Sequence, residues 1–157
     1  MNTKSSILQE VSQAKIAHMR WVKRADHLIS DLPVDKEFIP LEATNCGFGR
    51  WLYSETASQL RVTETFKYML EQIEFHHDNL HDAYSKIYKI YFIMPEKRSL
   101  LHKLVTFNSK TVSDEEKVEA KKYFEILKKS SEDLIALLDK FESEVRGVTS
   151  FTELNNV

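Results

Sequence analysis

Two histidines interrupt the apolar faces of predicted long helices, and a third lies one turn beyond one of them. His18 lies on the apolar face of a predicted helix over about residues 5–30, and His77 lies on that of a predicted helix over about residues 62–92. His81 follows His77 by four residues, which on a helix places the imidazoles about 40° apart and about 6 Å apart along the axis. This spacing allows both rings to bind one cation. For an isolated buried histidine, a hydrogen bond to a neighbouring group is the more common role.

The other three histidines do not share this arrangement. His76 points about 100° away from His77 on the same predicted helix. His27 falls on the helix face opposite His18, and His102 lies in a connecting region. We expect all three to be solvated or locally hydrogen-bonded.

Cys46 is the single cysteine of the chain, and it lies in a stretch that is typical of the start of a short helix. Thr44 or Asn45 is expected to cap that helix. Gly47 and Gly49 are two of only three glycines, and because glycine lowers helix stability, the pair predicts a close approach of this helix to its neighbours. A helix N-terminus also favours the thiolate that a metal requires. The alternative is that Cys46 is a small buried apolar side chain.

Glycine and proline are placed so that three long segments are left for helices. Two of them, over about residues 5–30 and 62–92, carry the histidines, and the third begins at Ser113. The stretch from Ser113 to Glu116 has the form of a capping box, and Gly147 stands where a helix C-terminal glycine is expected. No segment alternates strongly enough for a strand. We therefore predict an all-α fold, an antiparallel four-helix bundle of three long helices and a short helix that bears the cysteine.

The whole chain, residues 1–157, is predicted to form one domain with its core between about residues 5 and 147. An extra short helix or a loop is expected near residues 95–110. The tail over residues 148–157 shows little periodicity and is expected to be loosely held.

Composition argues against several classes of function. The 22 Lys and Arg residues are balanced by 24 Asp and Glu residues, a net charge of −2, so nothing predicts nucleic-acid binding. No apolar stretch is long enough to span a bilayer, and the N-terminus lacks a signal-peptide pattern. A single cysteine excludes an internal disulfide and fits a reducing cytosol. We therefore expect a cytoplasmic protein that binds neither nucleic acid nor membrane.

The candidate metal-binding residues fall in three short motifs, whose order and spacing are more specific than any one residue. The motifs are His18-Met19-Arg20-Trp21, Cys46-Gly47-Phe48-Gly49-Arg50-Trp51 and His77-Asp78-Asn79-Leu80-His81. Together they resemble the signature of the bacterial chemoreceptor zinc-binding domain family. That signature is His-x-x-apolar, Cys-x-apolar-Gly-x-apolar and His-x-x-x-His, separated by gaps of roughly two dozen residues. Every element is present in order, and both gaps fit.

The resemblance implies four zinc ligands and a set of residues that pack around them. The ligands fall on His18, Cys46, His77 and His81, and the packing residues are Trp21, Phe48, Gly49 and Trp51. Three imidazoles and one thiolate form a borderline-soft tetrahedral set that suits zinc and is poor for magnesium or calcium. Because such a centre carries a net charge of about +1, a carboxylate from Glu74, Asp78 or Asp82 is expected to support the ligands.

The resemblance also implies a regulatory role. Relatives are attached to chemoreceptor signalling regions or to diguanylate cyclases, where zinc occupancy or oxidation of the ligand cysteine alters output. This sequence shows neither a receptor coiled coil nor a cyclase signature, so we expect a stand-alone domain that forms a homodimer or acts on a signalling protein in trans. The alternative is a zinc-stabilised structural or adaptor bundle without switching.

Two enzyme classes fit the sequence less well. Hydrolytic zinc sites keep one coordination position open for water, and four protein ligands would close it. A di-iron bundle needs a Glu-x-x-His motif twice, and the one candidate is Glu74-x-x-His77. We therefore expect no enzymatic activity.

Overall fold

The computed structural model describes residues 4–34, 40–95 and 112–148, and every regular element within these ranges is helical. Three helices are long, α1 (Lys4–Ile29), α4 (Glu64–Tyr88) and α6 (Asp114–Gly147), and two are short, α2 (Gly47–Leu52) and α3 (Glu55–Leu60). A 3₁₀ turn, η1 (Ala43–Asn45), precedes α2, and a π-helical turn, η2 (Lys89–Ile93), extends α4. The predicted all-α fold is confirmed. Among the described residues, no helix has the length and apolar character needed to cross a membrane.

The later long helices begin where short polar side chains satisfy their first backbone N–H groups. The Ser113 hydroxyl accepts from the Glu116 N–H at 3.2 Å, and the Glu116 carboxylate accepts from the Ser113 N–H at 2.8 Å. The predicted capping box is therefore present at the start of α6. Thr63 caps α4 through the Phe66 N–H at 3.4 Å.

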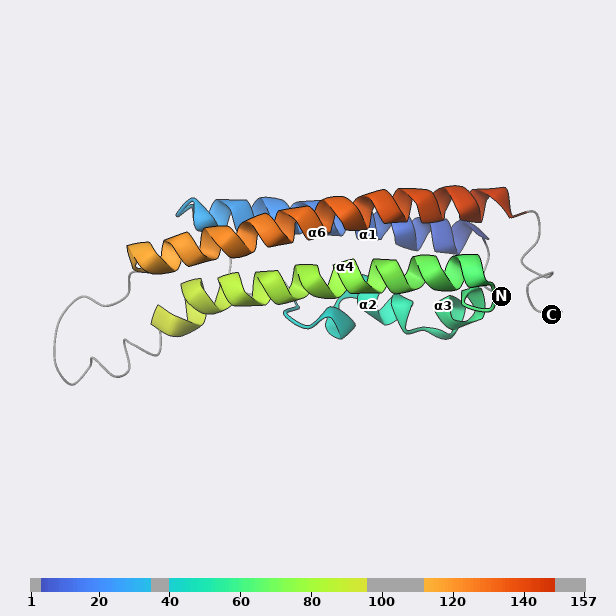
Figure 1. Cartoon of the computed structure of the whole chain (residues 1–157), viewed down its shortest axis with the longest axis horizontal. Coiled ribbons are helices and arrows are strands. Elements are labelled where there is room, and N and C mark those ends of the chain that lie inside the picture. The colour runs from blue at the N-terminus through green and yellow to red at the C-terminus, as the bar shows by residue number, and fades with distance from the viewer. Residues whose placement is uncertain (1–3, 35–39, 96–111, 149–157) are drawn as a thin grey trace.

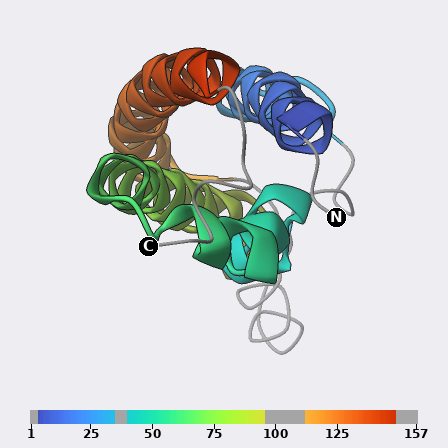
Figure 2. The ribbon, with the colours of Figure 1, turned by 90° about the vertical axis from the view of Figure 1, so that its right-hand side faces the viewer.

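The three long helices lie side by side, and the short helices run along one flank of them (Figure 1). α1 and α4 run in the same direction, and α6 runs in the opposite one. Seen along the long axis, α6 lies beside both α1 and α4, and α2 and α3 fill the remaining corner (Figure 2). The start of α2 is thereby placed between α1 and α4, the two helices that carry the candidate histidines.

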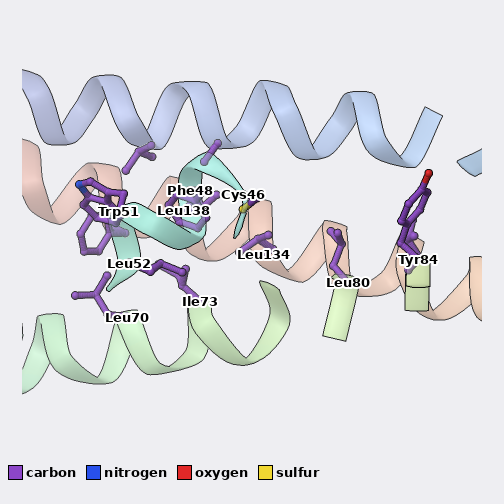
Figure 3. Packing of buried hydrophobic residues seen from close by; sticks show 14 of the residues in the cluster. Cys46, Phe48, Trp51, Leu52, Leu70, Ile73, Leu80, Tyr84, Leu134 and Leu138 are labelled. Atoms are coloured by element: carbon purple, nitrogen blue, oxygen red, sulfur yellow. The ribbon is translucent and has the colours of Figure 1, made fainter. Parts of the chain in front are cut away.

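A continuous cluster of buried apolar side chains holds these helices together. Its members include Ile7, Val11, Leu52, Leu70, Ile73, Leu80, Leu127, Leu134, Leu138 and Phe141, all nearly inaccessible to solvent. Cys46 lies part-way along this core, with Leu70 toward one end and Tyr84 toward the other (Figure 3). Since burial of one such aliphatic side chain contributes about 1.5–3 kcal/mol, apolar packing alone stabilises the bundle on both sides of the cysteine.

The structure differs from the prediction in two details, an additional short helix and the way in which α6 ends. The segment before α4 contains two short helices rather than one. The unpredicted α3 follows Ser54, whose hydroxyl accepts from the Ala57 N–H at 3.4 Å. Gly147 is the last residue of α6, as expected, but it is not a left-handed cap, because no glycine in the described ranges has a positive φ. The chain instead leaves the helix in an extended conformation at Val148.

The end of α4 passes into the π turn η2 shortly before Pro95. Proline has no N–H to donate and its ring crowds the carbonyl four residues earlier, which explains why the helical ladder loosens here. Residues 96–111 and 149–157, which hold most of the loop or extra helix expected near residues 95–110 and most of the expected tail, lie outside the described residues.

Candidate metal centre

Four side chains from three separate elements converge inside the bundle. His18 comes from α1, Cys46 immediately precedes α2, and His77 and His81 come from α4. One ligand atom from each lies within 4.8 Å of all the others, and all four residues are buried. A tetrahedral zinc centre with bonds of about 2.0–2.3 Å has ligand–ligand distances of about 3.3–3.8 Å. The arrangement therefore needs only a small contraction to hold one zinc ion.

Backbone carbonyls fix the orientation of two imidazoles. The Nδ1–H of His18 donates to the Ala14 carbonyl at 2.7 Å, and the Nδ1–H of His81 donates to the Leu41 carbonyl at 3.3 Å. Each ring is thus held in the tautomer whose Nε2 carries the free lone pair, the usual way in which a metal-binding histidine is oriented. The His81 Nε2 is buried and has no hydrogen-bond partner within the described part of the chain. Such an orphaned acceptor is costly, and a metal ion would satisfy it.

The third imidazole points its Nε2 at the sulfur. The His77 Nε2 lies 3.2 Å from the Cys46 Sγ, close to the separation of two ligands on one zinc ion. On the other side of the ring, Nδ1 lies 4.0 Å from the Asp78 carboxylate and makes no hydrogen bond among the described residues. Asp78 is therefore the carboxylate placed to support this histidine, and a small rotation would bring it into hydrogen-bond range.

The other two carboxylates expected to support the ligands have different partners. Glu74 accepts from the Tyr53 hydroxyl at 2.7 Å and from the Arg61 guanidinium at 3.0 Å. Asp82 pairs with Lys86 at 2.6 Å on the outer side of α4. Of the three carboxylates, Asp78 is the one that lies near a candidate ligand, at 4.0 Å from the His77 Nδ1 and beyond hydrogen-bond distance, so its supporting role stays a prediction.

Burial keeps the three imidazoles neutral, which is the form that binds a metal. Desolvation lowers the pKa of His18 below its ordinary value, although the hydrogen bond to the Ala14 carbonyl acts in the opposite direction. Desolvation also lowers the pKa of His77 to about 3, with a further contribution from the charges of His18 and His81. The pKa of His81 falls to about 4, again mainly through burial. The free lone pairs are therefore available over the whole physiological pH range.

The cysteine behaves differently from the sequence-based expectation. Its sulfur accepts a hydrogen bond from the Gly49 N–H at 3.1 Å, so Cys46 itself caps α2, whereas Thr44 and Asn45 belong to the preceding turn η1. Burial raises the pKa of the Cys46 thiol, and the N–H groups and nearby Arg50 offset this only in part. The helix N-terminus alone thus does not produce a thiolate. A bound cation would, because metal coordination deprotonates a thiol.

The backbone packs so closely at Gly49, three residues after Cys46, that a side chain would not fit there. A Cβ at this position would lie 1.8 Å from the Ala43 carbonyl oxygen and 3.3 Å from the Thr44 Cα, both backbone atoms of η1. At Gly47, a Cβ would meet no atom nearer than the Arg50 side chain at 4.0 Å. The predicted close approach is confirmed for Gly49, and it brings α2 against its own preceding turn. This contact fixes the position of Cys46 between the two.

Aromatic rings surround the four side chains. Trp21 packs edge-on against His18 and against His81, with ring centroids 5.5 and 4.5 Å apart. Phe48 packs in the same way against His18 and His77, at 5.7 and 5.4 Å. Trp51 lies one layer farther out, stacked on Phe48 and in edge contact with Phe141 of α6. These apolar walls lower the local dielectric around the ligands.

The remaining histidines stay outside the cluster wherever the structure describes them. His76 lies 3.8 Å from Asp133 of α6, and His27 is partly exposed near the end of α1. His102 lies outside the described residues. Sequence reasoning missed the Leu41 carbonyl that orients His81, and no local pattern marks it, because it depends on how the segment before η1 crosses α4. The Ala14 carbonyl was predictable, since it lies one helical turn before His18.

Comparison with protein families gives an independent assignment. Residues 18–88 match the family described as the chemoreceptor zinc-binding domain, and this range contains all four converging side chains. Neither the curated proteins nor the solved structures provide a match to the chain. The donor set, the orphaned His81 nitrogen and the family agree on zinc. The stretch that matches the chemoreceptor zinc-binding domain, residues 18–88, thus holds His18, Cys46, His77 and His81, which are positioned to hold a metal.

Proposed function

We propose that this protein is a zinc-binding regulatory or sensory domain of bacterial signal transduction. In this proposal His18, Cys46, His77 and His81 are the four ligands of one zinc ion. The observation that carries the proposal is the convergence of one ligand atom from each, within 4.8 Å, at a buried point where three elements meet. When bound, zinc would supply a tetrahedral centre that ties α1, the start of α2 and α4 together.

A full set of four protein ligands argues for regulation and against catalysis. A catalytic zinc site keeps a coordination position for water or substrate. Here His18, Cys46, His77 and His81 would fill all four positions of a tetrahedral zinc ion, which leaves none for water or substrate. We therefore propose that the protein is not an enzyme.

The signal would be read through Cys46, which is the only ligand outside the long helices. An oxidant such as hypochlorous acid would convert the thiolate to a sulfenic acid, with oxygen transferred to sulfur and chloride released. The same atom accepts the capping hydrogen bond from Gly49, so oxidation would release both the fourth ligand and the start of α2. His18, His77 and His81 would remain in place on α1 and α4. Zinc loss from the same site is the second signal that this geometry supports.

The wider setting of the domain follows from the family resemblance. We propose a cytoplasmic protein that works in chemotaxis or in cyclic-di-GMP signalling, as a homodimer or on a signalling partner. We also propose that residues 1–157 are a single domain and that the fold is an antiparallel four-helix bundle. In that bundle α2 and α3 together occupy the corner between α1 and α4 (Figure 2).

The second candidate function is a structural one, in which zinc only stabilises the bundle. It is favoured by the position of the centre inside a continuous apolar core, where a metal would strengthen packing without altering any surface. A structural zinc ion can contribute on the order of 10 kcal/mol to folding.

Mild oxidation separates the two functions. The wild-type protein loaded with zinc is treated with about one equivalent of hypochlorous acid, and zinc release and the near-ultraviolet circular dichroism are followed. A sensor releases zinc or changes conformation, whereas the Cys46→Ala variant shows no oxidant-dependent change. A wild-type protein that keeps its zinc and its spectrum after its cysteine has been oxidised would leave only the structural role.

A further inference from the structure

A groove of about 300 Å³ leads from the surface to one edge of the candidate metal centre. It lies between α1 and the segment from Pro40 to Phe48. His18 and Cys46 both line it, whereas His77 and His81 are not among its lining residues in the described part of the chain. The edge of the ligand set formed by His18 and Cys46 therefore borders this groove.

Small residues keep this groove open. Ala14 and Ala17 of α1 form one wall, and Gly47 of α2 forms part of the other. Ala17 is exposed, and a Cβ added to Gly47 would meet only the end of the Arg50 side chain, at 4.0 Å. Larger side chains at these two positions would fill the groove without a backbone conflict. The groove thus exists because the residues at these positions are small, and the backbone itself leaves room for larger side chains.

Aromatic rings form further walls of this groove. Trp21 and Phe48 both line it and pack on His81 and His77, with Trp51 stacked behind Phe48 against α6. Glu10 and Gln13 also line the groove, and their carboxylate and amide oxygens are ligand types that divalent cations accept. The groove therefore gives an ion access to two of the four ligand side chains, and it offers oxygen atoms from Glu10 and Gln13 on the way.

We infer that this groove is the route by which zinc reaches and leaves the centre, with exchange at the edge formed by His18 and Cys46. The inference rests on the proposed zinc site and concerns its kinetics. His77 and His81 lie one turn apart on a single helix, so their relative positions stay fixed while His18 and Cys46 bind or release the zinc ion. A chelating molecule that removes zinc would approach through the groove.

The test is an Ala17→Phe variant, with Ser12→Phe as the matched control, since Ser12 is an exposed small residue of α1 that does not line the groove. Zinc transfer to an excess of a chromogenic chelator should slow on the order of tenfold in Ala17→Phe, while the equilibrium Kd changes by less than about twofold, because an obstacle in a path slows passage in both directions. Gly47→Leu should fill the same groove from α2 and give the same result. Transfer rates equal to those of the wild type and of Ser12→Phe, in both groove variants, would overturn the inference.

A second measurement needs no zinc. In the metal-free protein, alkylation of Cys46 by iodoacetamide should be slower in Ala17→Phe and Gly47→Leu than in the wild type or Ser12→Phe. Equal alkylation rates in all four proteins would show that the groove is not the path to the sulfur. Absence of zinc from the wild-type protein would instead contradict the proposed function, and the alkylation rates would still report on access to the site.

Discussion

The backbone N–H of Gly49 donates to the Sγ of Cys46 at 3.1 Å, and the same sulfur lies 3.2 Å from the Nε2 of His77. One atom thus caps the short helix α2 and faces the imidazoles of the candidate metal centre. Gly49 also allows α2 to lie directly against the Ala43 carbonyl. Cys46 and Gly49 therefore link the position of α2 to the presence of the sulfur among the candidate ligands.

The two roles of Cys46 can be separated by substitution. A serine keeps an oxygen that accepts from the Gly49 N–H but is a poor zinc ligand, whereas an alanine loses both functions. We expect Cys46→Ser and Cys46→Ala each to weaken zinc binding by on the order of 100-fold or more. In the metal-free state, urea unfolding should show Cys46→Ala about 1 kcal/mol less stable than Cys46→Ser. Equal stabilities of the two metal-free variants would mean that the sulfur does not act as a helix cap.

The glycine pair gives a matched comparison. Gly49→Ala would place a methyl group 1.8 Å from the Ala43 carbonyl oxygen, so α2 or η1 must shift. We expect a loss of about 2–4 kcal/mol in the free energy of unfolding, together with weaker zinc binding. A methyl group in Gly47→Ala would meet no atom nearer than the end of the Arg50 side chain, at 4.0 Å, so this variant should be neutral or up to about 1 kcal/mol more stable. Urea unfolding and zinc titration of both variants check this, and similar results for the two would contradict the packing described here.

Local sequence signals predicted much of this fold. The capping box at Ser113 and Glu116 marks the start of α6, because both partners lie within four residues of each other. His18 and His77 stand out in the sequence because each lies on the apolar face of a helix, where a polar ring requires a binding partner. The four-residue spacing to His81 then added a second nitrogen at the same point. Features set by helix geometry within one segment were thus accessible from the sequence.

Features that depend on how segments pack against one another could not be predicted from the sequence. The six-residue helix α3 was not predicted, because it is too short to show a periodic pattern. Residue type predicts Thr44 or Asn45 as the cap of α2, because both are common caps, whereas the turn η1 places the Cys46 sulfur at that position. The position of the Glu74 carboxylate likewise depends on tertiary contacts, with the Tyr53 hydroxyl and the Arg61 guanidinium.

Acid should destabilise the metal-free protein. The pKa values of His77 and His81 are about 3 and about 4 in the folded state, against about 6.5 in an unfolded chain. The unfolded state therefore binds protons that the folded state does not, and stability falls as the pH drops from about 6.5 toward 4. Each histidine contributes up to about 1.4 kcal/mol per pH unit in this window.

The acid effect is measured by urea unfolding at several pH values in the presence of a chelator. A metal-free His77→Leu variant should lose stability less steeply, because one of the two buried titrating groups is absent. A slope as steep as that of the wild type would show that His77 is not held neutral in the folded chain.

Removal of zinc should leave the bundle helical. The apolar core extends on both sides of Cys46, so we expect far-ultraviolet circular dichroism after chelation to keep most of its helical signal. Restoring free zinc to 1,000 times its Kd should raise the free energy of unfolding by about 4 kcal/mol. A random-coil spectrum after chelation would favour the structural role of zinc over the sensory one.

The zinc content of the purified protein and of its single-alanine variants, measured after dialysis against a weak chelator, tests whether the four converging side chains are zinc ligands. We predict about one zinc per chain in the wild type, and little or none in the variants of His18, Cys46, His77 and His81. His76→Ala, which removes the neighbouring histidine outside the cluster, should keep its zinc. A wild-type protein without zinc, or full zinc content in all four ligand variants, would contradict the metal centre described here.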